Sequence, residues 1–127
     1  MLSKKMLAAL NGQINAELYS SYLYLSMAAW FESQNLRGFA HWMRVQAQEE
    51  HGHAMKFYDF ILERMSRVAL AAVDAPPASW SNAAGAFADV CKHEAKVTGL
   101  IDGLADLASA QKDHATGVFL QWFVSEH

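Results

Sequence analysis

Three glutamates and one histidine interrupt otherwise apolar helical faces in this sequence of 127 residues. Residues spaced by three and four positions lie on one face of an α-helix, which in a bundle is the face turned toward the core. On three such faces the acidic members are Glu17, Glu50 and Glu94, and His53 follows Glu50 by one turn. Carboxylates and an imidazole that meet inside a core predict a site for a metal ion.

The rest of each face consists mainly of apolar and aromatic residues. The three faces comprise Leu10, Ile14, Glu17, Ser21, Tyr24 and Ala28; Phe39, Met43, Gln46, Glu50, His53, Phe57 and Phe60; and Phe87, Val90, Glu94, Val97, Ile101, Leu104 and Ala108. A single glutamate on such a face is more often a residue at the edge of the core than a ligand, and a lone histidine is more often a hydrogen-bonded core residue. The recurrence on three faces favours the metal site.

Long helices must position these residues. Ser3, Asn82 and Asp113 are residue types that commonly cap helix N-termini. The sequence therefore predicts a first helix to about residue 33, a second after a turn at 35–38 that reaches about residue 65, a third to about residue 111, and a fourth from Asp113.

The segment 66–81 contains two adjacent prolines and separates the second helix from the third. Its 16 residues can span roughly 53 Å when extended, whereas a helix of about 30 residues is about 45 Å long. This connection can therefore cross the length of a bundle and set the second and third helices parallel. The predicted fold is an all-α four-helix bundle with one long crossover, forming a single domain over residues 1–127.

The three glutamates are also predicted to lie at one level of this bundle. Glu17, Glu50 and Glu94 follow the expected helix starts, at residues 3, 37 and 82, by 14, 13 and 12 residues. Burying ionised carboxylates without partners costs on the order of several kcal/mol each, and the three faces carry no lysine or arginine. A metal ion is the simplest neutraliser, and these donors suit iron or manganese better than zinc or copper. Tyr24, on the face of Glu17, is expected to donate a hydrogen bond or an electron at the site, or else to be a core tyrosine.

Composition argues against several other classes of protein. The net charge is −3 and no basic run is present, which disfavours nucleic acid as a partner. No apolar stretch reaches the roughly 18 to 20 residues of a membrane helix, and the apolar run at residues 6–10 is too short for a signal peptide. We expect a cytoplasmic protein. The single cysteine, Cys91, excludes an internal disulfide and is predicted to pack in the core.

Four stretches of the sequence resemble the prokaryotic non-haem ferritins, and the resemblance covers the whole chain. They are Asn-Ala-Glu-Leu-Tyr-Ser-Ser-Tyr-Leu-Tyr at 15–24, Gln-Ala-Gln-Glu-Glu-His-Gly-His at 46–53, Lys-His-Glu at 92–94 and Phe-Leu-Gln-Trp-Phe-Val-Ser-Glu at 119–126. The resemblance implies that Glu17, Glu50 and His53 hold a first ferroxidase iron. Glu50 would bridge to a second iron held by Glu94, and Tyr24 matches the tyrosine beside the first iron.

The resemblance also implies a third, more weakly held iron, with Glu49 and Glu126 as contributors. Helical spacing alone leaves Glu49 on a solvated face. His127 stands where the family usually has a glutamine next to the second iron, and it is either an additional ligand or a terminal residue in solvent. Bacterioferritin and rubrerythrin carry two Glu-x-x-His pairs, and Val97 stands where the second histidine would be.

The function implied by the resemblance is iron storage by a ferroxidase. Two Fe(II) ions would be oxidised by dioxygen at a dinuclear centre inside the bundle, in a subunit of a homo-oligomer that forms a 24-subunit cage if the full fold is present. Because the family continues past the position of His127 with an acidic stretch and a fifth helix, we expect this chain to be truncated within the fourth helix. The alternatives are a non-catalytic structural subunit with a weakened metal site and a di-iron protein that consumes peroxide.

Overall fold

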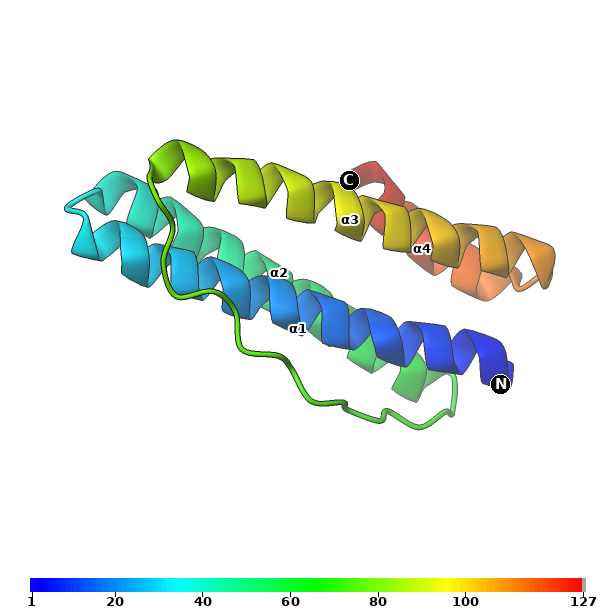
Figure 1. The fold of residues 1–127 in the computed structure, drawn as a ribbon. Coiled ribbons are helices and arrows are strands. Elements are labelled where there is room, and N and C mark those ends of the chain that lie inside the picture. Colours follow the sequence, from blue (N-terminus) through cyan, green and yellow to red (C-terminus); the bar gives the residue numbers. More distant parts are fainter. Residues whose placement is uncertain (127) are drawn as a thin grey trace.

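Four α-helices make up the computed structural model, which describes residues 1–126. They are α1 (Lys4–Ser33), α2 (Arg37–Glu63), α3 (Ala83–Ala110) and α4 (His114–Glu126). Figure 1 shows α1 and α2 as an antiparallel pair, after which the connection runs back along the bundle, so that α3 is parallel to α2. The predicted all-α bundle with one long crossover is confirmed.

The predicted N-caps start the helices where the sequence places them. The Ser3 side chain accepts a hydrogen bond from the Met6 amide at 3.0 Å, and Asn82 accepts one from the Gly85 amide at 2.7 Å. Asp113 accepts a bond from the backbone of Thr116 at 3.1 Å and another from its hydroxyl at 2.7 Å. Each cap satisfies an amide that the first helical turn leaves without a partner.

The first three helices end in the same way, with a non-glycine residue in the left-handed conformation. These residues are Asn35, Met65 and Lys112, with φ of 58°, 57° and 55°. After α2, for example, the amide of Met65 donates to the carbonyl of Leu62 and that of Ser66 to the carbonyl of Ile61, which is the Schellman pattern. The second helix was predicted to reach about residue 65, and this left-handed residue ends it earlier, at Glu63.

The crossover is fastened to α1 by side-chain hydrogen bonds. Asn11 accepts from the Ala69 amide at 2.9 Å and donates to the Arg67 carbonyl at 3.2 Å, and Asn15 donates to the Ala72 carbonyl at 2.9 Å. Further along, the Ser26 hydroxyl donates to the carbonyl of Pro77 at 2.6 Å. The long connection is therefore an ordered strap along the outside of α1, as Figure 1 shows.

The apolar interior is divided into two clusters by a polar layer. One cluster joins the first half of α1 with the second halves of α2 and α3 and with α4, and includes Leu10, Phe57 and Ile101. The other joins the second half of α1 with the first halves of α2 and α3, and includes Phe31 and Met43. Buried polar residues, among them Glu17, Ser20 and Glu50, belong to neither cluster. The fold therefore places carboxylates between two hydrophobic cores.

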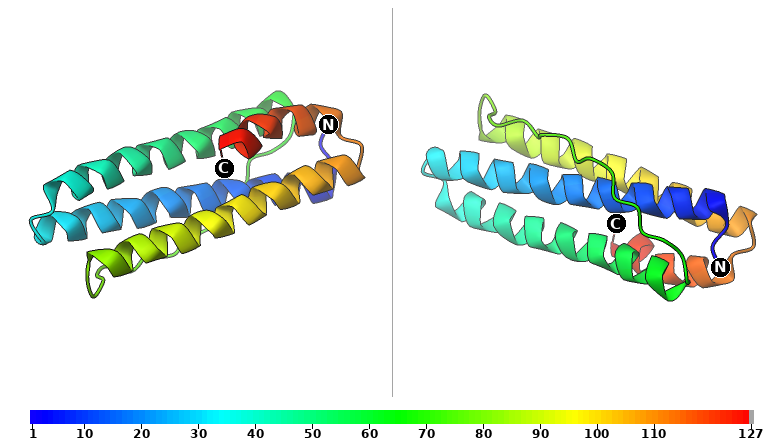
Figure 2. Two further views of the ribbon diagram at one scale, coloured as in Figure 1. Left: turned by 90° about the horizontal axis from the view of Figure 1, so that it is seen from above. Right: turned by 90° about the horizontal axis from the view of Figure 1, so that it is seen from below.

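The short α4 packs on α2 through stacked aromatic rings. Phe60 and Phe119 stack with ring centroids 4.0 Å apart, and Phe57 and Phe123 stack at 4.3 Å. Figure 2 shows that α4 accompanies α2 and α3 over only part of their length. Beyond its end lies an apolar groove of about 660 Å³, lined by Phe39 among others. Phe39 was predicted to face the core, but 44% of it is exposed at the start of α2.

Two further sequence-based expectations bear on the surface. The prediction that Cys91 packs in the core is wrong, because this free thiol is exposed on α3. Its position, one residue after the buried Val90, turns it away from the bundle axis. Among the described residues 1–126, no helix is both long and apolar enough to cross a membrane.

Candidate metal centre

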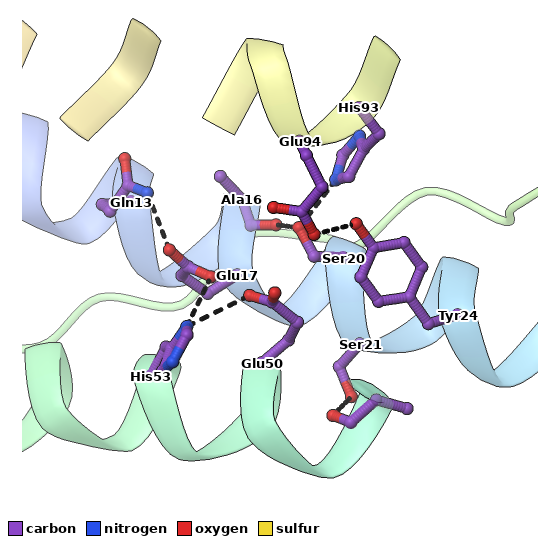
Figure 3. A network of polar contacts seen from close by, with 11 residues as sticks. Gln13, Ala16, Glu17, Ser20, Ser21, Tyr24, Glu50, His53, His93 and Glu94 are labelled. Carbon is purple, nitrogen blue, oxygen red and sulfur yellow. Dashed lines mark hydrogen bonds and ion pairs between the residues drawn. The ribbon is translucent and has the colours of Figure 1, made fainter. Parts of the chain in front are cut away.

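Glu17, Glu50 and Glu94 each lie near the middle of a helix, in the polar layer between the two apolar clusters. Because α1 and α2 are antiparallel neighbours of similar length, their midpoints come to the same height. The Glu17 side chain is fully buried, Glu50 is 4% exposed, and Glu94 is half-buried on α3. Figure 3 shows the three carboxylates and the His53 imidazole converging from α1, α2 and α3.

Glu17, Glu50 and His53 form the tightest group in this layer. One potential ligand atom from each of them lies within 4.8 Å of the others. Nδ1 of His53 is 3.2 Å from Oε2 of Glu50 and 3.7 Å from Oε2 of Glu17. The Glu17 Oε2 atom is buried, and it is paired with the His53 ring across the 3.7 Å separation. A buried carboxylate is costly unless a cation, either an imidazolium or a metal ion, lies beside it.

Glu94 reaches the same layer from α3. The hydroxyl of Tyr24, on α1, donates a hydrogen bond to Oε1 of Glu94. Figure 3 shows the Glu94 carboxylate directed toward that of Glu50. Both residues line a cavity of about 210 Å³ together with Tyr24 and His53. The phenol of Tyr24 is therefore committed to orienting Glu94 beside this cavity.

The charges of the group shift one another's pKa values. Burial raises the pKa of Glu50 to about 7, with a further contribution from Glu17. Burial alone would lower the pKa of His53, but its two carboxylate neighbours outweigh burial and raise it to about 9. The pKa of Glu17 would also rise on burial, yet the nearby His53 holds it below its usual range. Burial and the hydrogen bond to Glu94 raise the pKa of Tyr24. The imidazolium therefore supplies positive charge in the metal-free protein.

The remaining candidates lie at the rim of the cavity or outside the described residues. Glu49 and Glu126 are exposed, and both line the cavity that Glu50 and Glu94 share. Helical spacing alone assigned Glu49 to a solvated face, and it is exposed there while bordering the cavity. His127, predicted to be a ligand or a terminal residue in solvent, lies outside the described residues 1–126.

Three polar residues near the centre were not predicted from the helical faces. Gln13 donates a hydrogen bond to Oε1 of Glu17 at 3.1 Å, and its position one turn before Glu17 is a signal that spacing could have supplied. His93 lies with Nε2 2.7 Å from the Ser20 hydroxyl, and its ring meets that of Tyr24 edge to face. The Ser20–His93 contact joins α1 to α3, so the sequence around either residue does not predict it.

Comparison with known protein families identifies the family of this chain. The model of the ferritin-like domain matches residues 7–127. The chain belongs to the ferritin family. Among curated ferritins, the bacterial non-heme ferritin of Bacteroides fragilis is 45% identical over 126 residues, which cover 99% of this chain and 79% of that protein. The bacterial non-heme ferritin of Staphylococcus saprophyticus is 40% identical over 99% of this chain and 75% of its own length.

Solved ferritin structures have the same fold. An open-pore ferritin from the hyperthermophilic archaeon Archaeoglobus fulgidus superposes with a TM-score of 0.97 and 55% identity, over 99% of this chain and 78% of that one. The ferritin of Chlorobium tepidum has a TM-score of 0.97 and 40% identity, over 99% of this chain and 77% of its own. The described bundle is thus similar to most of a ferritin subunit.

The residues of this ferritin fit a bound metal ion. Ligand atoms that coordinate one ion at about 2.1 Å lie roughly 3 to 4.2 Å apart in an octahedral arrangement. The separations of 3.2 and 3.7 Å from His53 Nδ1 fall in that range. A divalent cation would also neutralise the buried Glu17 carboxylate once His53 has lost its proton. Hard oxygen donors with one imidazole are a donor set suited to iron.

Proposed function

We propose that this ferritin-family chain is an iron-storage subunit that oxidises Fe(II) to Fe(III) with dioxygen. The proposal combines family membership with one observation of the centre itself. That observation is the fully buried Glu17 carboxylate, which lies with Glu50 and His53 so that one potential ligand atom of each is within 4.8 Å of the others. Two carboxylates buried this close together repel each other, and a cation held between them removes that cost.

Within the proposal, two Fe(II) ions are the substrates of the centre. Glu17 and His53 hold the first, Glu94 holds the second, and Glu50 bridges the two. This division is the one that the resemblance to the non-haem ferritins implies. It is supported by the position of Glu50, which lies beside His53 on α2 and shares the 210 Å³ cavity with Glu94 on α3. Tyr24 orients Glu94 through its hydroxyl. Two electrons, one from each iron, pass to dioxygen, which with two protons becomes hydrogen peroxide while both irons become Fe(III). The protein contributes position and partial exclusion of water.

A third, weaker iron is proposed at the rim of the same cavity, held by Glu49 and Glu126. Both carboxylates border that cavity and both are exposed. Exposed ligands keep much of their hydration and bind a cation less tightly than buried ones. Such a site could receive ferric iron on its way from the dinuclear centre to the store.

Stopped-flow absorbance of Fe(II) oxidation in air tests the proposed activity. The wild-type protein is expected to show a fast phase that saturates at about two irons per chain. Glu50→Ala is expected to lose this phase, because both irons lose their shared ligand. Glu63→Ala is the matched control, since Glu63 is an exposed residue at the far end of the same helix. Oxidation in Glu50→Ala as fast as in the wild type would refute the dinuclear site.

The same experiment separates the other functions considered for the sequence. A structural subunit with a weakened site predicts oxidation no faster than in buffer for the wild type as well as for the variant. A peroxide-consuming protein predicts faster oxidation by hydrogen peroxide than by dioxygen at equal Fe(II). The proposed ferroxidase predicts a fast phase with dioxygen alone.

A further inference from the structure

Gln13 is a buried amide one helical turn before Glu17 on α1. Only 3% of the residue is exposed, and its Nε2 donates to Oε1 of Glu17 at 3.1 Å. Its neighbours on the helix include the fully buried Leu10 and Ile14, which belong to the apolar cluster. A primary amide in such surroundings costs free energy that one hydrogen bond offsets only in part. We therefore expect Gln13 to act through its hydrogen bond to Glu17.

The hydrogen bond makes the two oxygens of the Glu17 carboxylate inequivalent. Oε1 accepts from Gln13, while Oε2 is the atom paired with Nδ1 of His53, 3.7 Å away. A carboxylate with both oxygens free can turn and chelate an ion through both of them. Figure 3 shows Gln13 bonded to one oxygen of the Glu17 carboxylate and His53 beside the other. Oε2 is therefore the oxygen that Glu17 presents to the site.

We propose that Gln13 is a positioning residue that makes Glu17 a single-oxygen ligand of the first metal ion. This inference rests on the proposed metal centre and adds a determinant of its geometry. By reserving Oε1, Gln13 fixes the direction of Oε2 before the metal arrives, so less ordering is needed on binding. It also limits the number of protein oxygens on that ion, which leaves coordination positions for other ligands.

The test is a titration of the metal-free protein with Co(II), whose visible absorption reports both binding and coordination. Gln13→Met keeps the approximate volume of the side chain and removes the donor. We expect its dissociation constant for Co(II) to rise about 10- to 100-fold, the usual cost of losing an outer hydrogen bond to a ligand. We also expect weaker visible bands, because a chelating Glu17 raises the coordination number. The second change would not follow from a general loosening of the fold.

Gln48→Met is the matched control, because Gln48 is an exposed glutamine on α2. It should bind Co(II) with the affinity and spectrum of the wild type. Gln13→Asn covers the case in which Gln13→Met fails to fold. Its amide is one methylene too short to reach Oε1, so it should show the same loss as Gln13→Met while keeping a polar group at the position.

The possible outcomes separate this inference from the proposed function. If folded Gln13→Met, or folded Gln13→Asn in its place, binds Co(II) with wild-type affinity and spectrum, Gln13 does not position Glu17. If the wild-type protein itself binds no Co(II), the proposed metal centre is wrong and the inference falls with it. Binding by the wild type together with weakened, spectrally altered binding by the Gln13 variants supports both.

Discussion

In the metal-free centre, a positively charged His53 lies beside the buried carboxyl groups of Glu17 and Glu50. The imidazole Nδ1 lies between Oε2 of Glu50 and Oε2 of Glu17, at 3.2 and 3.7 Å. These contacts raise the pKa of His53 to about 9 against the effect of burial. A proton on His53 thus offsets the buried negative charge, and an incoming cation must displace it.

Metal binding at this centre should therefore release protons. At pH 7, His53 with a pKa of about 9 is protonated and Glu50 with a pKa of about 7 is about half protonated. The bound metal requires both in their deprotonated forms, so about one to two protons should leave for each Co(II) bound. Affinity should rise with pH until these groups have lost their protons. Calorimetric titration in buffers of different ionisation enthalpy measures the number released.

The control for the proton count is Glu63→Ala, which leaves the three clustered residues intact and should release as many protons as the wild type. An affinity independent of pH between about pH 6 and 8 would contradict the description of a protonated centre. It would mean that the ligands are already deprotonated in the metal-free protein.

At the level of residues, the members of the centre that interrupt apolar helical faces could be predicted from the sequence. Gln13, one turn before Glu17, could also have been found from spacing, whereas Ser20 and His93 meet only through a contact between helices. Glu17, Glu50 and His53 were predicted from spacing, and the structure brings them together. That they bind iron stays a prediction. The Ser20–His93 contact depends on how α1 and α3 are placed side by side. No periodicity within one helix encodes that placement.

The helices themselves were largely predictable, because their starts depend on local chemistry. Ser3, Asn82 and Asp113 cap the helices that the sequence assigned to them. The end of α2 was less predictable, since Met65 adopts a left-handed conformation that a side chain disfavours. Phe39 was misassigned because helical period predicts which residues share a face but not which part of that face a neighbouring helix covers.

Replacing the left-handed residue after α2 should stabilise the protein. Met65 has a φ of 57° and is 80% exposed, so Met65→Gly removes backbone strain with little loss of packing. The gain is expected to be up to about 1 kcal/mol, because the greater freedom of glycine in the unfolded chain offsets part of it. Urea unfolding measures it. Met65→Ala retains a Cβ and should give no gain; an equal gain from alanine would rule out strain as the cause.

The aromatic stacking between α2 and α4 should contribute much of the free energy that holds α4 on the bundle. Phe123 is 1% exposed and stacks on Phe57. Phe123→Ala should lower the free energy of unfolding by about 3 to 5 kcal/mol through lost burial and a residual cavity. Val118→Ala, at an exposed position of α4, should change it little. A loss below about 1 kcal/mol for Phe123→Ala would show that α4 contributes little to the fold.

As a whole molecule, the bundle combines two apolar clusters with an apolar groove at the start of α2. The groove includes the rings of Phe39 and Trp42. The crossover and the bundle were predicted because chain length and helix length limit the possible connections; the assembly of subunits was not predictable in this way, because interfaces depend on surfaces that no intrachain pattern constrains.

We expect the protein to form a homo-oligomer, in line with its membership of the ferritin family. Light scattering coupled to size-exclusion chromatography measures the mass, and electron microscopy shows whether the particles are hollow shells. A mass equal to that of a single chain, unchanged by concentration, would contradict the expectation of assembly. The metal centre lies within one bundle and would remain testable in a monomer.

The most direct test of the dinuclear centre is anomalous diffraction at the iron absorption edge, from crystals loaded with Fe(II) without oxygen. We predict two neighbouring peaks between α1, α2 and α3, with the Glu50 carboxylate between them. The first should lie against Glu17 and His53, and the second against Glu94. Iron bound only at the exposed surface, with none at Glu17 and Glu50, would contradict the account of this protein as a ferroxidase.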